Sequence, residues 1–140
     1  MKKRIALLLG LALMVVPVAF AGNGSKVTVP MQYNTNNCGE VSGKKFDGTV
    51  TFSQKKGTLT VTVDIAGGDP TGSYWLYLYY DAPTPCSYWA YLGKIKIDAS
   101  GRARKVIKVT DTSGYNNWIV YAENGDSGLY DTSQVAHLGA

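Results

Sequence analysis

Few residues in this chain have side chains that could catalyse a reaction. His137 is the single histidine, and no G-x-S-x-G segment is present to expose a nucleophilic serine on a tight turn. A glycoside hydrolase needs two carboxylates flanking its substrate. Glu40 and Glu123 are the only glutamates, and the aspartates mostly stand at expected turns. The sequence therefore predicts a non-enzymatic protein in which His137 is an ordinary strand residue.

The same scarcity applies to metal ligands. One His and two Cys exclude a centre built from several such ligands. Two loops, residues 111–117 and 124–131, contain acids and amides whose oxygens suit Ca²⁺. Neither has the D-x-[DN]-x-[DN]-G spacing that gathers such oxygens into one cage. These residue types also form turns, so we predict turns there, with no metal site and no cofactor.

An aromatic run, YWLYLYY at residues 74–80, is the most informative feature. Leu76 and Leu78 share a parity in a strand, so burying both forces the residues that alternate with them to the opposite face. Aromatic rings on that face would lie about 6.6–7 Å apart. Such a row can stack on sugar rings or accept the apolar surface of a partner. The predicted ligand- or partner-binding residues are Trp75, Tyr77 and Tyr79.

Three further aromatic residues, between positions 88 and 91, could widen this patch. Alternation with Ile95 and Ile97, however, turns Trp89 and Tyr91 inward, away from it. A competing interpretation of the whole aromatic run is structural. In that case the rings pack against cross-strand neighbours, with lysine stems lying over them, or are covered by a loop.

The elements that must position these rings have the pattern of β-strands. Period-2 alternation dominates, and no window shows a helical stripe. In residues 58–65, aliphatic residues alternate with three threonines and Asp64, which is typical of a strand with one buried and one solvated face. The expected strands are residues 26–33, 49–53, 58–65, 74–80, a strand containing Ile95 and Ile97, 103–109, 118–123 and 132–138.

Two links between strands have the composition of tight turns. Residues 54–57 end in Gly57, which supplies the positive φ of a short hairpin, so the strands on either side should pair. In residues 98–101 the Asp98 side chain can accept hydrogen bonds from the turn, and Gly101 can close it. The same construction predicts a second hairpin, between the strand containing Ile95 and the strand at 103–109.

About eight short strands with regularly spaced turns predict an all-β protein, a two-sheet antiparallel sandwich. The segment LGKIKIDASGRA, residues 92–103, resembles a hairpin common in bacterial immunoglobulin-like and fibronectin-type-III-like domains. The resemblance covers residues 74–109 best. It implies an immunoglobulin-like sandwich of about 7–8 strands and no activity. A small closed β-barrel is the alternative that the same alternation permits.

The beginning of the chain has the pattern of a secretory signal peptide. Three cations at positions 2–4 precede an apolar run at residues 5–16, and the AFA at 19–21 forms an A-x-A cleavage site. The run is short for a membrane span and is interrupted by Gly and Pro. We expect cleavage to remove residues 1–21. Residues 22–140 would remain as one domain with no membrane span, secreted or periplasmic.

Cleavage also changes the charge. Removing three of the 14 Lys and Arg leaves 11, against 10 Asp and Glu. The remaining lysines are scattered along the sequence among acids, so it shows no basic stripe able to neutralise several phosphates. Nucleic acid is therefore not expected as a partner.

Export determines how the two cysteines are interpreted. Outside the cytoplasm, Cys38 and Cys86 are predicted to form one disulfide. Its role would be structural, because redox pairs are usually spaced as C-x-x-C. Free thiols, or bonds between chains, are the alternatives.

These observations predict an exported, non-enzymatic binding domain that uses an outward aromatic sheet face and loops. Carbohydrate or another cell-surface ligand is favoured, because aromatic platforms with nearby hydroxyls and amides suit sugars. The alternative is a structural protein that self-associates, or assembles on a protein surface, through sheet edges and the Tyr-rich face. A secreted inhibitor is a third possibility, for which no specific loop stands out.

Overall fold

The computed structural model describes residues 25–32, 47–70, 72–80, 87–124, 129–133 and 135–139. All regular elements within these ranges are β-strands. Accordingly, the described residues include no helix able to cross a bilayer. The strands are β1 (Ser25–Gln32), β2 (Asp47–Lys55), β3 (Thr58–Ala66), β4 (Ser73–Tyr80), β5 (Ser87–Lys96), β6 (Ala103–Val109), β7 (Asn117–Asn124), β8 (Leu129–Ser133) and β9 (Ala136–His137).

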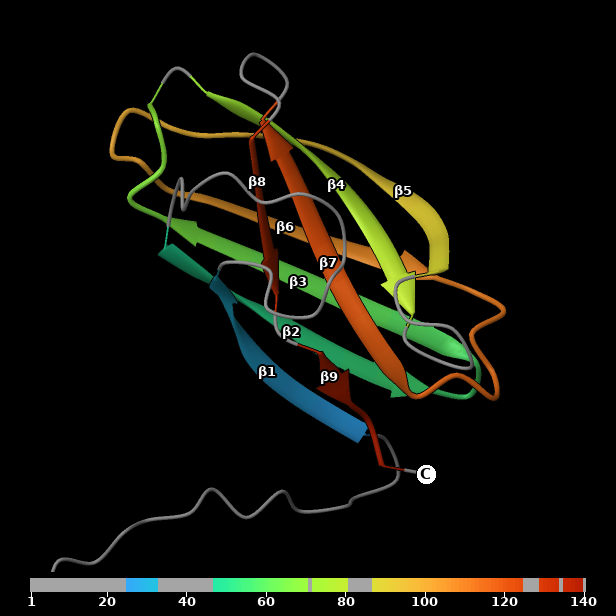
Figure 1. Cartoon of the computed structure of the whole chain (residues 1–140). Helices are drawn as coiled ribbons and strands as arrows, with labels where there is room; N and C mark the ends of the chain where they lie inside the picture. The colour runs from blue at the N-terminus through green and yellow to red at the C-terminus, as the bar shows by residue number, and fades with distance from the viewer. Residues whose placement is uncertain are drawn as a thin grey trace, which may run out of the picture.

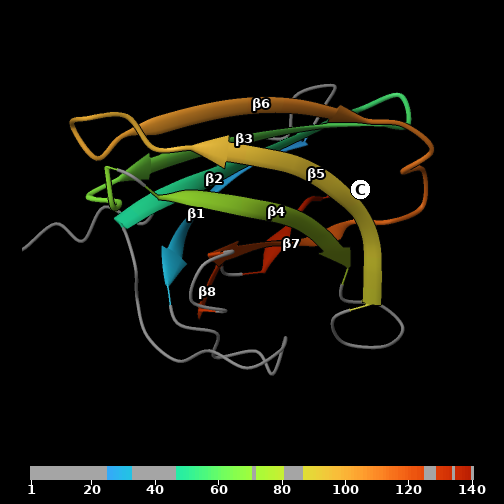
Figure 2. The same cartoon turned by 90° about the horizontal axis from the view of Figure 1, so that it is seen from above.

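The strands form two antiparallel sheets of four strands each, packed face to face (Figures 1 and 2). One sheet has the order β1-β2-β3-β6 and the other β5-β4-β7-β8, with β9 beside β7. The path of paired strands ends at β5 and at β6, which lie side by side without joining the two sheets into a closed ring. The predicted two-sheet sandwich is confirmed, and the alternative of a closed barrel is wrong.

Strand β1 belongs to both sheets. Its residues Ser25 to Pro30 pair with β2, while Met31 and Gln32 pair with β8. The chain therefore passes from one layer into the other within a single strand, on the side of the sandwich opposite β5 and β6 (Figure 1).

The first predicted hairpin is confirmed. Strands β2 and β3 pair without interruption from Asp47 with Ala66 to Lys55 with Thr58. The two residues between them, Lys56 and Gly57, both have positive φ, of 49° and 73°. This is the two-residue turn whose twist matches that of the flanking strands.

The second predicted hairpin is wrong. The turn itself forms, since the amide of Gly101 donates to the carbonyl of Asp98 at 3.0 Å. The strands on either side nevertheless pair with different partners, β5 with β4 and β6 with β3. A tight turn reverses the chain direction but does not determine which neighbouring strand each of the two strands pairs with. The turn after Ile97 stands at a corner between the two sheets.

The strand order also bears on the predicted resemblance. Immunoglobulin constant-type domains have the sheets A-B-E-D and C-F-G, whereas here three consecutive strands, β1, β2 and β3, lie adjacent in one sheet. The strand order does not confirm the resemblance to immunoglobulin-like and fibronectin-type-III-like domains, which stays a prediction.

The core lies between the two inner faces. In β3, Leu59, Val61, Val63 and Ile65 are buried, as their alternation predicts. From the other sheet the largest buried contribution is Trp118 on β7. The predicted strand at 132–138 is found as two shorter strands, β8 and β9.

Two predictions concern residues that the structure does not describe. The signal peptide at residues 1–21 and both ends of the Cys38–Cys86 disulfide lie outside the described ranges. Both stay predictions.

Candidate functional site

The aromatic run forms β4, and its parity is as predicted. Leu76 and Leu78 are fully buried, and the residues that alternate with them are half-buried on the opposite, outer face of the sheet. This places Trp75, Tyr77 and Tyr79 together on the outer face, in the middle of the β5-β4-β7 part of the sheet.

Strand β5 brings two further tyrosines to the same face. Its pairing with β4 shifts register twice, so that Leu92 and Trp89 are each an extra residue on β5. After these bulges Tyr91 stands opposite Tyr77, and Tyr88 stands opposite Tyr79. Their exposed fractions are 51% for Tyr91 and 57% for Tyr88.

The prediction that Tyr91 points inward is therefore wrong, whereas that for Trp89 is confirmed, since it packs at 5.3 Å on buried Trp118. Simple alternation fails because each bulge inserts one residue and reverses the parity beyond it. Gly93, beside the first bulge, has a φ of +96°. An isolated glycine within a strand pattern is the sequence signal that could have indicated this irregularity.

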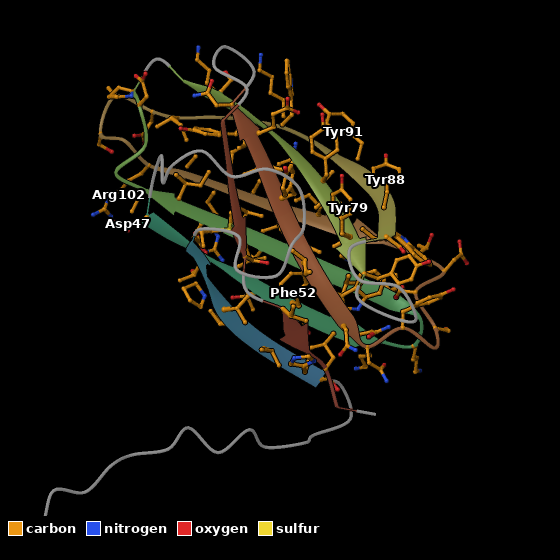
Figure 3. The ribbon with its side chains drawn as sticks, in the orientation of Figure 1. Asp47, Phe52, Tyr79, Tyr88, Tyr91 and Arg102 are labelled. Atoms are coloured by element: carbon orange, nitrogen blue, oxygen red, sulfur yellow. The ribbon has the colours of Figure 1, made fainter. Side chains whose placement is uncertain are left out.

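The three side chains of β4 and the two tyrosines of β5 form one surface, which we call the aromatic face. Three of its five members are labelled in Figure 3. Tyr77 and Tyr91 have ring centroids 5.4 Å apart, and Tyr79 lies 5.7 Å from Tyr88 with the rings nearly perpendicular. These tilted and edge-on pairs are the favourable geometries for aromatic rings. The members of the aromatic face are Trp75, Tyr77, Tyr79, Tyr88 and Tyr91.

Two further side chains, those of Lys94 and Tyr121, pack against these rings. Nζ of Lys94, which stands opposite Trp75, lies 5.9 Å from the centroid of the Trp75 ring. Tyr79 also packs edge-on against Tyr121 of β7, at 5.7 Å. Packing of the kind that the structural interpretation predicts is thus present, while Tyr88 and Tyr91 keep about half of their surface open to solvent.

The hydroxyl group of Tyr77 is held in its neutral form. Burial, the negative charge of Glu123 and a hydrogen bond with that side chain together raise the pKa of Tyr77 above its ordinary value of 10.0. Strand β7 places Glu123 beside Trp75, on the other side from Lys94. The aromatic face therefore carries a neutral phenol, an acceptor and a cation around its rings.

A second aromatic cluster lies at one end of the sandwich, on the core side of the β4–β5 hairpin. Trp89 has ring centroids 5.6 Å from Tyr80, 4.7 Å from Tyr115 and 5.3 Å from Trp118. These rings pack against or within the core. The cluster anchors the far end of β5 and has a structural role.

The outer face of the other sheet is lined by hydroxyl groups instead of rings. Its threonines and serines include Thr28 and Thr51, whose Oγ1 atoms are 2.8 Å apart across β1 and β2. Hydroxyl groups of β2 and β3 also line a shallow hollow of about 300 Å³, with Asp64 and Arg104 at its edge. This face has the composition of an ordinary solvated sheet surface.

A larger cavity, of about 700 Å³, opens where β2, β3 and the turn after Ile97 come together. Three of the charged groups in its lining, those of Asp64, Asp98 and Arg104, make structural contacts. Nη1 of Arg104 lies 3.0 Å from both carboxylate oxygens of Asp64. The Asp98 carboxylate accepts the amides of Ser100 and Arg102 at 2.8 and 2.9 Å. We therefore place the candidate site on the aromatic face.

The predicted strand residue His137 and the possible metal ligands remain to be placed. Nδ1 of His137 on β9 lies 2.8 Å from Oδ1 of Asn117 on β7. No group of three or more His, Cys, Asp and Glu side chains is placed to hold a metal ion among the residues described.

Comparison with known proteins adds no assignment: no protein-family model matches this chain, and the search of curated proteins found no match.

Proposed function

We propose that this protein is an exported, non-enzymatic binding domain that holds carbohydrate against its aromatic face. The observation that carries the proposal is the gathering of five aromatic side chains on one outer sheet surface, two of them about half exposed. Exposed apolar patches on soluble proteins commonly mark interaction sites.

The chemistry of the aromatic face suits a sugar better than a purely apolar partner. A sugar ring has an apolar face that stacks on an aromatic ring, and a rim of hydroxyl groups that needs hydrogen-bonding partners. The phenol of Tyr77, the carboxylate of Glu123 and the ammonium of Lys94 stand beside the rings. Successive ranks of rings along β4 are spaced about 6.6–7 Å apart, which suits an extended chain.

The alternative of assembly through sheet edges is less well supported. Strand β5 interrupts its edge with two bulges and presents Lys94 and Lys96 there. Strand β6 turns the charged side chain of Lys105 towards the inner side of its sheet. Bulges, edge lysines and inward-pointing charges all oppose the pairing of one sheet edge with another.

Retention on a panel of neutral and acidic polysaccharides, combined with size-exclusion chromatography, tests the proposal. We expect a monomer that is retained, and a Tyr88→Ala/Tyr91→Ala variant that is retained several-fold less. The matched control is Val106→Ala, because Val106 is 56% exposed on the opposite sheet. Absence of retention on the whole panel, or equal retention of the tyrosine variant, would refute it. A large assembly without retention would instead support the structural alternative.

Export is a separate part of the proposal. Intact-mass measurement on exported material should give a chain that begins at Gly22. A mass that retains residues 1–21 would contradict the expected cleavage.

A further inference from the structure

Strands β5 and β6 carry an excess of positive charge. They lie at the side of the sandwich where no backbone ladder joins the two sheets, which we call the open side. Strands β5 and β6 carry five cationic residues and no acidic one: Lys94, Lys96, Arg104, Lys105 and Lys108. The remainder of the chain has nine Lys and Arg, against all 10 Asp and Glu. The sequence scatters these residues among acids, and only the fold, by placing β5 beside β6, brings them together.

Two of these cations share a surface with the aromatic face. Lys94 stands opposite Trp75 and Lys96 stands opposite Ser73, and both lysine side chains are exposed. On the outer face of the β4–β5 hairpin the side chains form a row that begins at Lys96 and continues through the pair of Lys94 and Trp75. Two cross-strand tyrosine pairs follow, Tyr77 with Tyr91 and Tyr79 with Tyr88, which we call the tyrosine ranks. From Ser73 to Tyr79 this strip extends about 20 Å. It is cationic at one end and neutral at the other.

The other cations on these strands are directed elsewhere. Arg104 forms an ion pair with Asp64 on the hydroxyl-lined sheet. Lys105 reaches across the open side and donates from Nζ to the backbone carbonyl of Lys94, at 2.9 Å. The ammonium groups of Lys94 and Lys96 are therefore those that a ligand on the aromatic face would meet.

The acidic group opposite Trp75 on β7 is already engaged. Glu123 lies beside Trp75, on the side away from Lys94, and shares a hydrogen bond with Tyr77. A ligand carboxylate or sulfate placed at Lys94 and Lys96 would gain two cations and would remain separated from Glu123 by the Trp75 ring.

From this arrangement we infer that the ligand is an anionic glycan. A sugar unit bearing a carboxylate or sulfate would lie at Lys94 and Lys96, and neutral units would stack on the tyrosine ranks. This inference rests on the proposed function and adds to it the charge of the ligand and the direction in which it lies.

The distribution of charge argues against a nucleic acid on the same strip. A single strand carries one phosphate per nucleotide and is bound by cations that follow its backbone between stacked bases. Here the two tyrosine ranks of the β4–β5 hairpin have no cationic side chain between them. The strip matches a chain whose charge is confined to some of its units.

Calorimetric titration with a hyaluronan oligosaccharide and with the same oligosaccharide after reduction of its carboxylates to alcohols tests the inference. We expect the charged form to bind roughly five- to tenfold more tightly, as two exposed ion pairs allow. This preference should shrink as salt is added. In the Lys94→Gln/Lys96→Gln variant the preference should disappear, because the charged form loses both ion pairs and then binds no more tightly than the reduced form. Lys94→Arg/Lys96→Arg should keep it.

The matched control removes two cations elsewhere. Lys55→Gln/Lys56→Gln, at the exposed turn between β2 and β3, should leave the preference unchanged. Equal binding of both oligosaccharides, or equal loss in this control, would overturn the inference and leave the proposed function standing. Tighter binding of a dT oligonucleotide than of the charged oligosaccharide would also overturn it. If neither oligosaccharide binds, the inference is overturned as well, and retention on the polysaccharide panel then decides separately whether the proposed carbohydrate function stands.

Discussion

The ammonium group of Lys105 donates a hydrogen bond of 2.9 Å to the backbone carbonyl of Lys94. It connects β6 of one sheet to β5 of the other, at the side of the sandwich where no backbone ladder joins them. Gly93 makes this contact possible, because a Cβ atom added there would lie 2.6 Å from Nζ of Lys105.

Gly93→Ala should therefore destabilise the protein. Its φ of +96° is one that side chains rarely adopt, and the new methyl group would displace Lys105. We expect a loss of roughly 1–2 kcal/mol in the free energy of unfolding, measured by denaturant titration. Because the adjacent bulge presents Tyr91, binding to the aromatic face should weaken too. Gly139→Ala is the control, since nothing lies within 4 Å of an added Cβ there. Equal unfolding midpoints for the two variants would show that Gly93 is not required.

Trp75→Ala should weaken binding and Leu76→Ala should lower stability, because the two side chains lie on opposite faces of β4. Loss of Trp75 should weaken ligand binding by roughly 1–3 kcal/mol and change stability little. Loss of fully buried Leu76 should cost about 2–5 kcal/mol of stability. Melting midpoint and binding are measured on each variant. If Trp75→Ala loses stability while each folded molecule binds as before, the aromatic face is only a packing surface.

How far the sequence predicts this site depends on the element. Leu76 and Leu78 define the faces of β4 by themselves, because alternation is a local property of a strand. For Tyr91 the same rule gives the wrong face, because two bulges intervene that depend on pairing with β4. The sequence also does not predict which strands pair with β5 and β6. The turn at Asp98 is compatible either with a hairpin or with a corner between two sheets. The grouping of cations on these strands follows only from that topology.

The phenol of Tyr77 should ionise at a higher pH than that of an ordinary tyrosine. Burial and then Glu123 raise its pKa above 10.0. Because the folded state prefers the neutral phenol, the associated stability is fully present below pH 10 and is lost as the pH rises through the higher folded pKa. Alkaline absorbance titration of Tyr77→Phe should lose the late-ionising phenolate, and Glu123→Gln should lower its pKa. Loss of a phenol that ionises at the ordinary pH would contradict this assignment.

Asp98 should contribute to stability in the opposite pH range. A hydrogen bond from the Ser100 hydroxyl, followed by one from the Arg102 amide, lowers its pKa below 3.8. The contribution is therefore present above pH 3.8 and is lost as the pH falls through the folded pKa. In melting curves at a series of acidic pH values, the advantage of the wild type over Asp98→Ala should decrease as the carboxylate is protonated. An advantage that is independent of pH would contradict this prediction.

The two cysteines should be bonded to each other in exported material. Unfolded, unreduced protein should then contain no titratable thiol, and reduction should lower stability by about 4 kcal/mol in the loop-entropy model. Two titratable thiols per chain would reject the bond between Cys38 and Cys86. Dimers that dissociate on reduction would show that it joins separate chains.

Because β1 pairs with β2 and, at Met31 and Ser133, with β8, the contact that fastens the two layers together joins distant parts of the chain. Such non-local contacts form late and slowly. The β2–β3 hairpin can form as soon as its residues are available, but the sandwich can close only after the chain has been synthesised as far as Ser133. A nascent chain of this topology lacks that contact until Ser133 has been made, which would suit passage of the unfolded chain through a translocation channel, as the proposed export requires.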